Sequence, residues 1–77
     1  MLRGEMDSAE AMGRMLQQGR LLRGLTQREL AHELGISQRY VYEIESGKPT
    51  KFAQRLFQMM HATGVRFYAE IPEPGDD

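Results

Sequence analysis

The chain has 77 residues, no cysteine and a formal net charge of −1. This length allows one small domain with a marginal core, and the lack of cysteine excludes disulfides, thiol chemistry and zinc-finger sites. No apolar run approaches the roughly 18 residues that a membrane span needs and no signal-peptide pattern opens the chain, so we expect a cytoplasmic protein without a membrane partner.

Positive charge is concentrated in the middle of the chain. Residues 14–55 contain eight lysines and arginines against four glutamates, whereas residues 1–13 and 56–77 are net negative. A basic middle can match phosphate even when the whole chain is slightly acidic. The alternative is that these charges are ordinary solvated helix faces, and only their placement along the helices favours the first interpretation.

Residues 1–7 show no pattern and are predicted to be disordered. Asp7 with Glu10 offers a capping box that opens a first helix at about Ser8. Gly24 ends this helix, and its apolar stripe consists of Met12, Met15, Leu16 and Leu22. Gly19, in mid-helix, costs about 1 kcal/mol relative to alanine, which indicates close packing or a gap filled from elsewhere.

Residues 26–47 have the spacing of two short helices joined by a tight turn. Thr26 can cap the first of them, with Glu29 completing a capping box. Gly35 stands where a left-handed residue would end that helix, Ser37 caps the second and Gly47 stops it. The residues expected to face inward are Leu30, Ala31, Leu34, Ile36, Val41 and Ile44. This arrangement is typical of a helix-turn-helix.

A fourth helix follows Pro49, capped by Thr50 and closed by Gly64. Its broad apolar face is expected to be core: Phe52 or Ala53, then Leu56, Phe57, Met59 and Met60. Residues 65–71 alternate apolar with larger polar residues, which is the period of a half-buried strand. Residues 72–77 form a short acidic tail with two prolines.

No other segment resembles a strand, and a lone strand leaves its backbone donors and acceptors unpaired. The simplest remedy is pairing with the same strand of a second subunit about a two-fold axis. Val65, Phe67, Ala69 and Ile71 would then form the dimer interface. The alternative is a fraying tail. The predicted fold is all-α: a four-helix domain over residues 8–64 and one C-terminal strand that pairs across a dimer.

Four segments carry a resemblance to a known family: GLTQ at 24–27, ELA at 29–31, GIS at 35–37 and VYEIESG at 41–47. Together they resemble the phage-repressor (XRE, Cro-like) helix-turn-helix family over roughly residues 12–64. The strand in place of a fifth helix, with GKPT at 47–50, resembles the narrower group of HipB-like antitoxins, whose dimers are joined by an intersubunit β-lid. Gly19 departs from the family, which usually has a large apolar residue there.

Recognition would run through the third helix, because an α-helix fits the major groove of DNA and residues near its N-terminus reach base edges. Gln38 and Arg39 are the best base readers, since glutamine can pair with adenine and arginine with guanine, and Tyr42 shares their face. The expected phosphate contacts are Thr26, Gln27, Arg28, Ser37 and Lys48. The resemblance implies that Gln27 also braces the reading glutamine, and that Arg20 and Glu45 form a structural ion pair.

Several of these roles have alternatives. Arg39 could contact only phosphate, the commoner role for arginine near DNA. Tyr42 could touch a thymine methyl or a phosphate. Tyr40 is expected to pack against the second helix, and Glu43 to be a solvated acid at the rim of the groove, although it could accept from a cytosine amino group.

Catalysis finds little support. His32 and Glu33 lack the second histidine of a metalloprotease motif, and no serine, histidine and acid cluster suggests a nucleophile with its base. We predict a non-enzyme with no cofactor, catalytic residue or metal site. The predicted partners are double-stranded DNA with an inverted-repeat operator and a second copy of the chain.

Two functions of different class follow. One is a sequence-specific repressor of phage type that acts alone. The other, which the HipB-like resemblance implies, is an antitoxin that represses its own operon and neutralises a HipA-like kinase toxin. Either protein would be bacterial or phage-encoded and associated with the nucleoid when bound.

Overall fold

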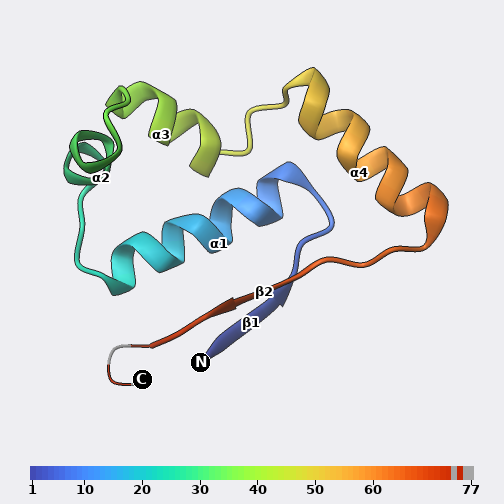
Figure 1. Cartoon of the computed structure of the whole chain (residues 1–77), viewed down its shortest axis with the longest axis horizontal. Helices are drawn as coiled ribbons and strands as arrows, with labels where there is room; N and C mark the ends of the chain where they lie inside the picture. The colour runs from blue at the N-terminus through green and yellow to red at the C-terminus, as the bar shows by residue number, and fades with distance from the viewer. Residues whose placement is uncertain (74, 76–77) are drawn as a thin grey trace.

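The computed structural model describes residues 1–73 and 75, and its described part contains four helices and two short strands. Their order along the chain is β1 (Leu2–Glu5), α1 (Ala9–Leu22), α2 (Gln27–Leu34), α3 (Gln38–Glu45), α4 (Lys51–Thr63) and β2 (Tyr68–Ile71). Figure 1 shows α1 at the centre, with α2 and α3 on one side of it, the strands on the other and α4 at one end. The four predicted helices are confirmed.

Short polar side chains start every helix. The hydroxyls of Ser8, Thr26, Ser37 and Thr50 each accept a hydrogen bond from the backbone N–H three residues further on, which satisfies a donor that a helix start leaves unpaired. The capping box expected at Thr26 is complete. The expected box at the first helix is replaced by a cap from Ser8 alone.

The ends of α1 and α3 approach each other so closely that only glycine fits between them. A Cβ on Gly13 would lie 2.4 Å from the carbonyl oxygen of Glu45 and 2.5 Å from that of Ile44. A Cβ on Gly47, whose φ is +75°, would lie 2.5 Å from the Cα of Glu10. The sequence patterns did not single out Gly13, because its role depends on where two distant segments cross.

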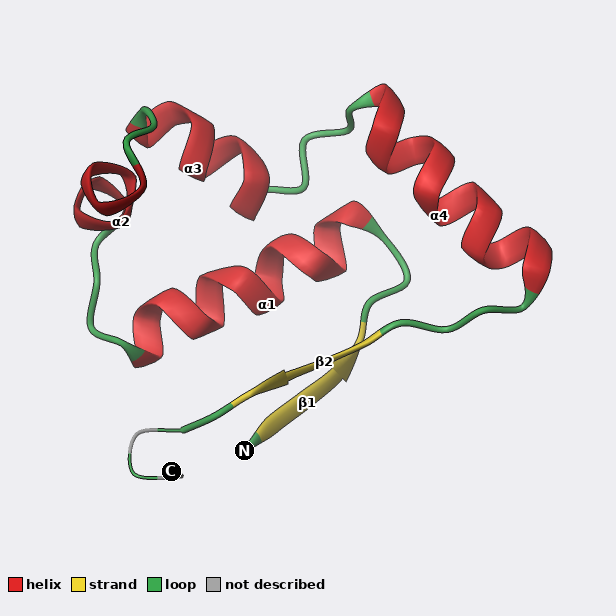
Figure 2. Cartoon of the chain, in the orientation of Figure 1, coloured by secondary structure: helices red, strands yellow, loops and turns green. Residues whose placement is uncertain are grey.

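The strand arrangement corrects two predictions, as Figure 2 shows. Residues 1–7, expected to be disordered, contain β1, and β2 pairs antiparallel with β1 in the same chain, not across a dimer. The register places Leu2 opposite Ile71 and Glu5 opposite Tyr68. The unpaired edge that called for a second subunit therefore has an internal partner. Exposed ion pairs flank the ribbon: Arg3–Glu70 at 3.2 Å and Arg66–Glu5 at 3.5 Å.

The alternation predicted for the C-terminal strand is present. Phe67, Ala69 and Ile71 are half-buried, whereas Val65 and the residues between them are exposed. Phe67 meets Phe57 of α4 edge to face, with ring centroids 6.5 Å apart. Ile71 lies 3.8 Å from the position that a Cβ on Gly19 would take. The gap at Gly19 is thus filled by β2.

The core is small and the molecule is thin, with extents of 36 × 30 × 15 Å. Buried hydrophobic residues number five in the described part: Ala11, Ala31, Val41, Phe57 and Met60. Six residues that were assigned to inward apolar faces are instead exposed, namely Leu16, Leu34, Ile36, Ile44, Phe52 and Met59. A layer one helix thick has no second layer to cover them.

Pro74, Asp76 and Asp77 of the predicted acidic tail lie outside the described residues. Among the helices of the described part, none combines the length and the hydropathy that crossing a bilayer requires.

Candidate nucleic-acid interface

The outer face of α3 presents polar side chains near the start of the helix. Gln38, Arg39 and Tyr42 are all exposed, and the side chain of Arg39 is 85% exposed. Val41 and Glu45, on the opposite side, are buried. The inward residues fix the helix to the domain, so its outer face is held in place while staying open to a partner. Tyr40, expected to pack against the second helix, is also exposed.

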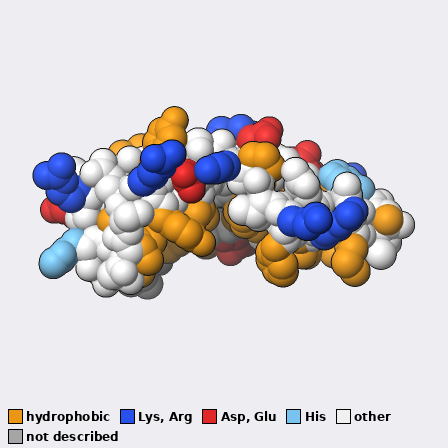
Figure 3. Space-filling model, turned by 90° about the horizontal axis from the view of Figure 1, so that it is seen from above, with side chains coloured by type: hydrophobic (Ala, Val, Ile, Leu, Met, Phe, Trp, Pro, Cys, Tyr) orange, Lys and Arg blue, Asp and Glu red, His pale blue; other side chains and the backbone are white. Residues whose placement is uncertain are grey.

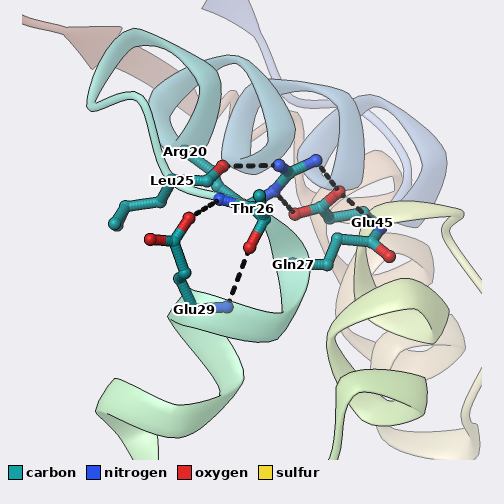
Figure 4. Close-up of polar contacts among 6 residues, drawn as sticks. All are labelled: Arg20, Leu25, Thr26, Gln27, Glu29 and Glu45. Atoms are coloured by element: carbon teal, nitrogen blue, oxygen red, sulfur yellow. Dashed lines mark hydrogen bonds and ion pairs between the residues drawn. The ribbon is translucent and has the colours of Figure 1, made fainter.

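A polar joint fixes α3 to α1. Arg20 donates from Nε to Oε2 of Glu45 at 2.6 Å and from Nη2 to Oε1 at 3.0 Å. Their side chains are only 8% and 5% exposed. Arg20 also donates to the carbonyl of Leu25 at 2.8 Å, which extends the joint to the loop before α2 (Figure 4). The structure thus contains the ion pair that the resemblance implied.

Gln27 belongs to this joint. Its Nε2 donates to Oε1 of Glu45 at 3.1 Å (Figure 4), so its side chain points inward in the chain without DNA. The hydrogen bond from Arg20, with a smaller contribution from Gln27, holds the pKa of Glu45 below its ordinary value. Within the described residues no buried side-chain polar atom lacks a hydrogen-bond partner. The joint is fully satisfied.

The start of α2 combines a complete cap with unused donors. The backbone N–H of Thr26 donates to Glu29 Oε1 at 2.9 Å, and the N–H of Glu29 donates to Thr26 Oγ1 at 3.0 Å. The first of these bonds lowers the pKa of Glu29. In the described part of the chain, the N–H groups of Gln27 and Arg28 have no acceptor. Such groups at a helix N-terminus can bind an anion.

Glu43 holds two of the predicted DNA contacts. Its Oε1 accepts from Lys48 Nζ at 3.1 Å and lies 3.3 Å from Arg39 Nε. Lys48, followed by Arg39, holds the pKa of Glu43 below its ordinary value, so this acid stays charged at neutral pH. The sequence predicted that Glu43 is a solvated acid at the rim of the DNA groove, and it did not predict the ion pair with Arg39. The spacing of four residues on one helix could have indicated this pair.

The predicted site residues fall into two groups. Gln38, Arg39, Tyr42 and Lys48 are exposed on or just after α3, and Thr26 and Arg28 are exposed at the start of α2. Ser37 caps α3 through its hydroxyl, which accepts from Tyr40 N–H at 3.0 Å. Arg20, Gln27 and Glu45 lie inside, at the joint. The described residues contain no group of three or more acidic or histidine side chains that could hold a metal.

Comparison with known families gives one match, and it covers more than half of the chain. The model described as Helix-turn-helix matches residues 16–68. The chain belongs to this XRE/Cro-type helix-turn-helix family. The matched span runs from the second half of α1 to the start of β2, so it includes the polar joint and all of α3.

Neither curated proteins nor solved structures give a match. Membership in the helix-turn-helix family indicates a DNA-binding transcriptional regulator, a class that is typically non-enzymatic. The HipB-like subgroup receives no support from these comparisons.

Proposed function

We propose that this helix-turn-helix protein is a sequence-specific transcriptional repressor that binds an inverted-repeat operator as a homodimer. The main support is the contrast within α3. Gln38, Arg39 and Tyr42 are exposed near its start, while Val41 and Glu45 anchor its other side. A helix held in this way can enter the major groove without rearranging.

Base reading is assigned to the three exposed residues. Gln38 would pair with adenine and Arg39 with guanine, both bidentately, and Tyr42 would contact a thymine methyl or a phosphate. Arg39 must first exchange Glu43 for the base edge. Because the pair is exposed and its side chains lie four residues apart on one helix, this exchange costs little.

Phosphate contacts would flank the reading helix. Lys48 and Arg28 supply charge, and Thr26 and Ser37 stand at the starts of α2 and α3. Gln27 contributes through its backbone N–H, because its side chain is bonded to Glu45. These contacts would set the register of the protein on the duplex but carry no sequence information.

The test is a titration of the protein against a duplex enriched by it from a random pool. Gln38→Ala and Arg39→Ala should each weaken binding by about 1–3 kcal/mol. Lys48→Ala should weaken binding to all sequences alike and reduce the salt dependence by about one counterion. Matched controls are Gln18→Ala on α1 and Arg66→Ala, which remove the same groups from exposed positions outside α3. Equal losses in reading and control variants would refute the assignment.

A narrower function is proposed on one further observation. The chain continues from α4 into a strand, not into a fifth helix, which resembles HipB-like antitoxins. In that role the protein would repress its own operon and neutralise a HipA-like kinase toxin. The test is co-expression with the product of the neighbouring gene. A stable complex with a kinase supports the antitoxin, and a chain that purifies alone favours the solitary repressor.

A further inference from the structure

An apolar groove opens on one side of the molecule, between α1, the helix-turn-helix and β2. Its volume is about 500 Å³, and its lining includes Met15, Leu16, Leu34, Ile36, Ile44 and Ile71. Four of these side chains are exposed, namely Leu34 at 58% together with Leu16, Ile36 and Ile44, whereas Met15 and Ile71 are half-buried. Isolated exposed apolar residues are ordinary, but a contiguous set of this kind marks an interaction surface.

Helix α4 carries a second uncovered apolar surface. Phe52, Leu56 and Met59 follow one another at helical spacing, and Phe52 and Met59 are 79% and 67% exposed. The other side of α4 is already used, because Phe57 and Met60 are buried in the chain's own core. We call residues 52, 56 and 59 the α4 stripe.

Hydrophobic side chains of both ends of the molecule gather on one side of it. Figure 3 shows hydrophobic side chains along the lower edge of both lobes, the lobe of α2 and α3 and the lobe of α4, with a hollow between them. Since Phe52 and Met59 are the exposed large hydrophobic residues of α4, we assign the hydrophobic side chains of that lobe to the α4 stripe and place the groove near the other end of the same face. The reading residues of α3 do not line the groove.

We infer that a second copy of this chain covers the face, with the α4 stripe of each copy seated in the groove of the other. This extends the proposed repressor dimer and rests on it. A two-fold axis in the plane of the face exchanges its two ends, so both contacts form at once and the assembly closes. No strand pairing between subunits is needed.

The volume of the groove and the extents of the molecule agree with a second copy of the chain as the partner. An apolar cavity of about 150 Å³ holds one benzene-sized group, so a groove of about 500 Å³ holds about three, the number of side chains in the stripe. The molecule extends 36 × 30 Å along its two longer axes, so its flat side is large enough for the roughly 800 Å² per partner that stable interfaces bury. A small molecule in the groove would leave Phe52 and Met59 uncovered.

Cysteine cross-linking tests the contact directly, because the chain has no cysteine of its own. We expect Leu34→Cys mixed with Met59→Cys to form a disulfide-linked dimer on mild oxidation, in far higher yield than either variant alone. The mixture of Tyr42→Cys with Met59→Cys is the control, since Tyr42 is as exposed as Leu34 but lies on the reading face. Equal yields in the two mixtures would overturn the inference.

Two further readouts keep the test decisive. Phe52→Ser should weaken the dimer by about tenfold or more in sedimentation, with an unchanged circular dichroism spectrum because Phe52 touches little of its own chain. Tyr68→Cys that links to itself, while the Leu34–Met59 mixture does not, would place the interface at the strand edge and refute the inference. A chain that sediments as a monomer at millimolar concentration would also refute it.

The experiments can refute the proposed dimer interface and the proposed repressor function separately. A Leu34–Met59 cross-linked dimer that binds no duplex from a random pool would refute the repressor and leave the interface standing. Sequence-specific binding by a dimer that never cross-links at these positions would refute only the interface. Gln38→Ala should leave the cross-linking yield unchanged, since Gln38 does not line the groove.

Discussion

The polar joint and the apolar face lie side by side, since Arg20 and Glu45 also line the groove, but only the joint is covered by the chain's own residues. At the joint, the side chains of Arg20 and Glu45 are almost fully buried. Within the described residues, no buried side-chain nitrogen or oxygen atom lacks a hydrogen-bond partner. On the face, Leu34 and Met59 are mostly exposed. The difference shows which contacts the chain completes alone: it fixes α3 to α1 by itself, whereas it leaves the apolar side chains of the face uncovered.

This division suits a protein that reads DNA. A misplaced α3 would misplace the base contacts proposed for it, and the joint gives the helix one position through directional hydrogen bonds. Apolar packing is non-directional but scales with area, and in the proposed dimer the uncovered area would hold the two subunits together. Each region uses the interaction that fits its task.

The largest expected effect comes from breaking the joint. Arg20→Ala leaves the Glu45 carboxylate buried without its charged partner, which costs about 3–5 kcal/mol of the free energy of unfolding. Arg23→Ala is the matched control, because its pair with Glu33 is 3.8 Å long and exposed and such pairs contribute about 0–1 kcal/mol. Urea unfolding measures both. Similar losses in the two variants would mean that the joint is no stronger than a surface pair.

Two glycines of α1 sharpen the comparison, since one faces the joined side and the other faces β2. Gly13→Ala should lower the free energy of unfolding by about 1–3 kcal/mol, because its Cβ would collide with the backbone of Glu45. Gly19→Ala should raise it by about 0.5–1 kcal/mol, because its Cβ would meet Ile71 at an ordinary 3.8 Å. Thermal melting of the two variants checks the opposite signs. Destabilisation by both would place β2 closer to α1 than the structure has it.

These glycines also show which structural features could be predicted from the sequence. Helix caps depend on residues three apart, so Thr26, Ser37 and Thr50 were predictable from local spacing. The crossing at Gly13 joins α1 to the end of α3 and leaves no local signal. Gly19 was recognised as unusual, but no neighbouring residue in the sequence indicates that Ile71 fills the gap beside Gly19.

The strands and the open face were missed for related reasons. Residues 2–5 read Leu-Arg-Gly-Glu, which has no alternating pattern, and they form a strand because β2 supplies the partner from the far end of the chain. Leu34, Ile44 and Met59 were predicted to face inward but are exposed. Periodicity cannot tell whether the surface that covers such a face belongs to the same chain.

Acid should weaken the joint. The pKa of Glu45 is lowered in the folded chain relative to its ordinary value of 4.5, chiefly by Arg20. The stabilisation is therefore complete above pH 4.5 and is lost as the pH falls through the lower folded pKa. Unfolding of the wild-type protein and Glu45→Gln by urea, from neutral pH to about pH 3, should show a stability difference that shrinks below about pH 4.5. A difference that stays constant over this range would contradict the charged joint.

The smallest effect concerns Glu43, which pairs with Arg39 and Lys48, two of the residues proposed to contact DNA. Glu43→Gln should raise the affinity for duplex DNA several-fold and steepen its salt dependence, because two cations become available to phosphate. Glu33→Gln, an exposed acid on α2, changes the net charge equally and is the control. If both variants gain the same affinity, only the net charge matters and the pairing at Glu43 has no role.

The most direct test of base reading by α3 is a selection from random duplexes, run in parallel with the wild-type protein and with Arg39→Ala. The wild-type protein should enrich an inverted repeat whose half-site centres lie about 34–36 Å apart, or a multiple of that. Arg39→Ala should enrich the same repeat with the preference lost at one base pair of each half-site. Enrichment of identical sequences by both proteins, or of no sequence by the wild-type protein, would contradict recognition through this helix.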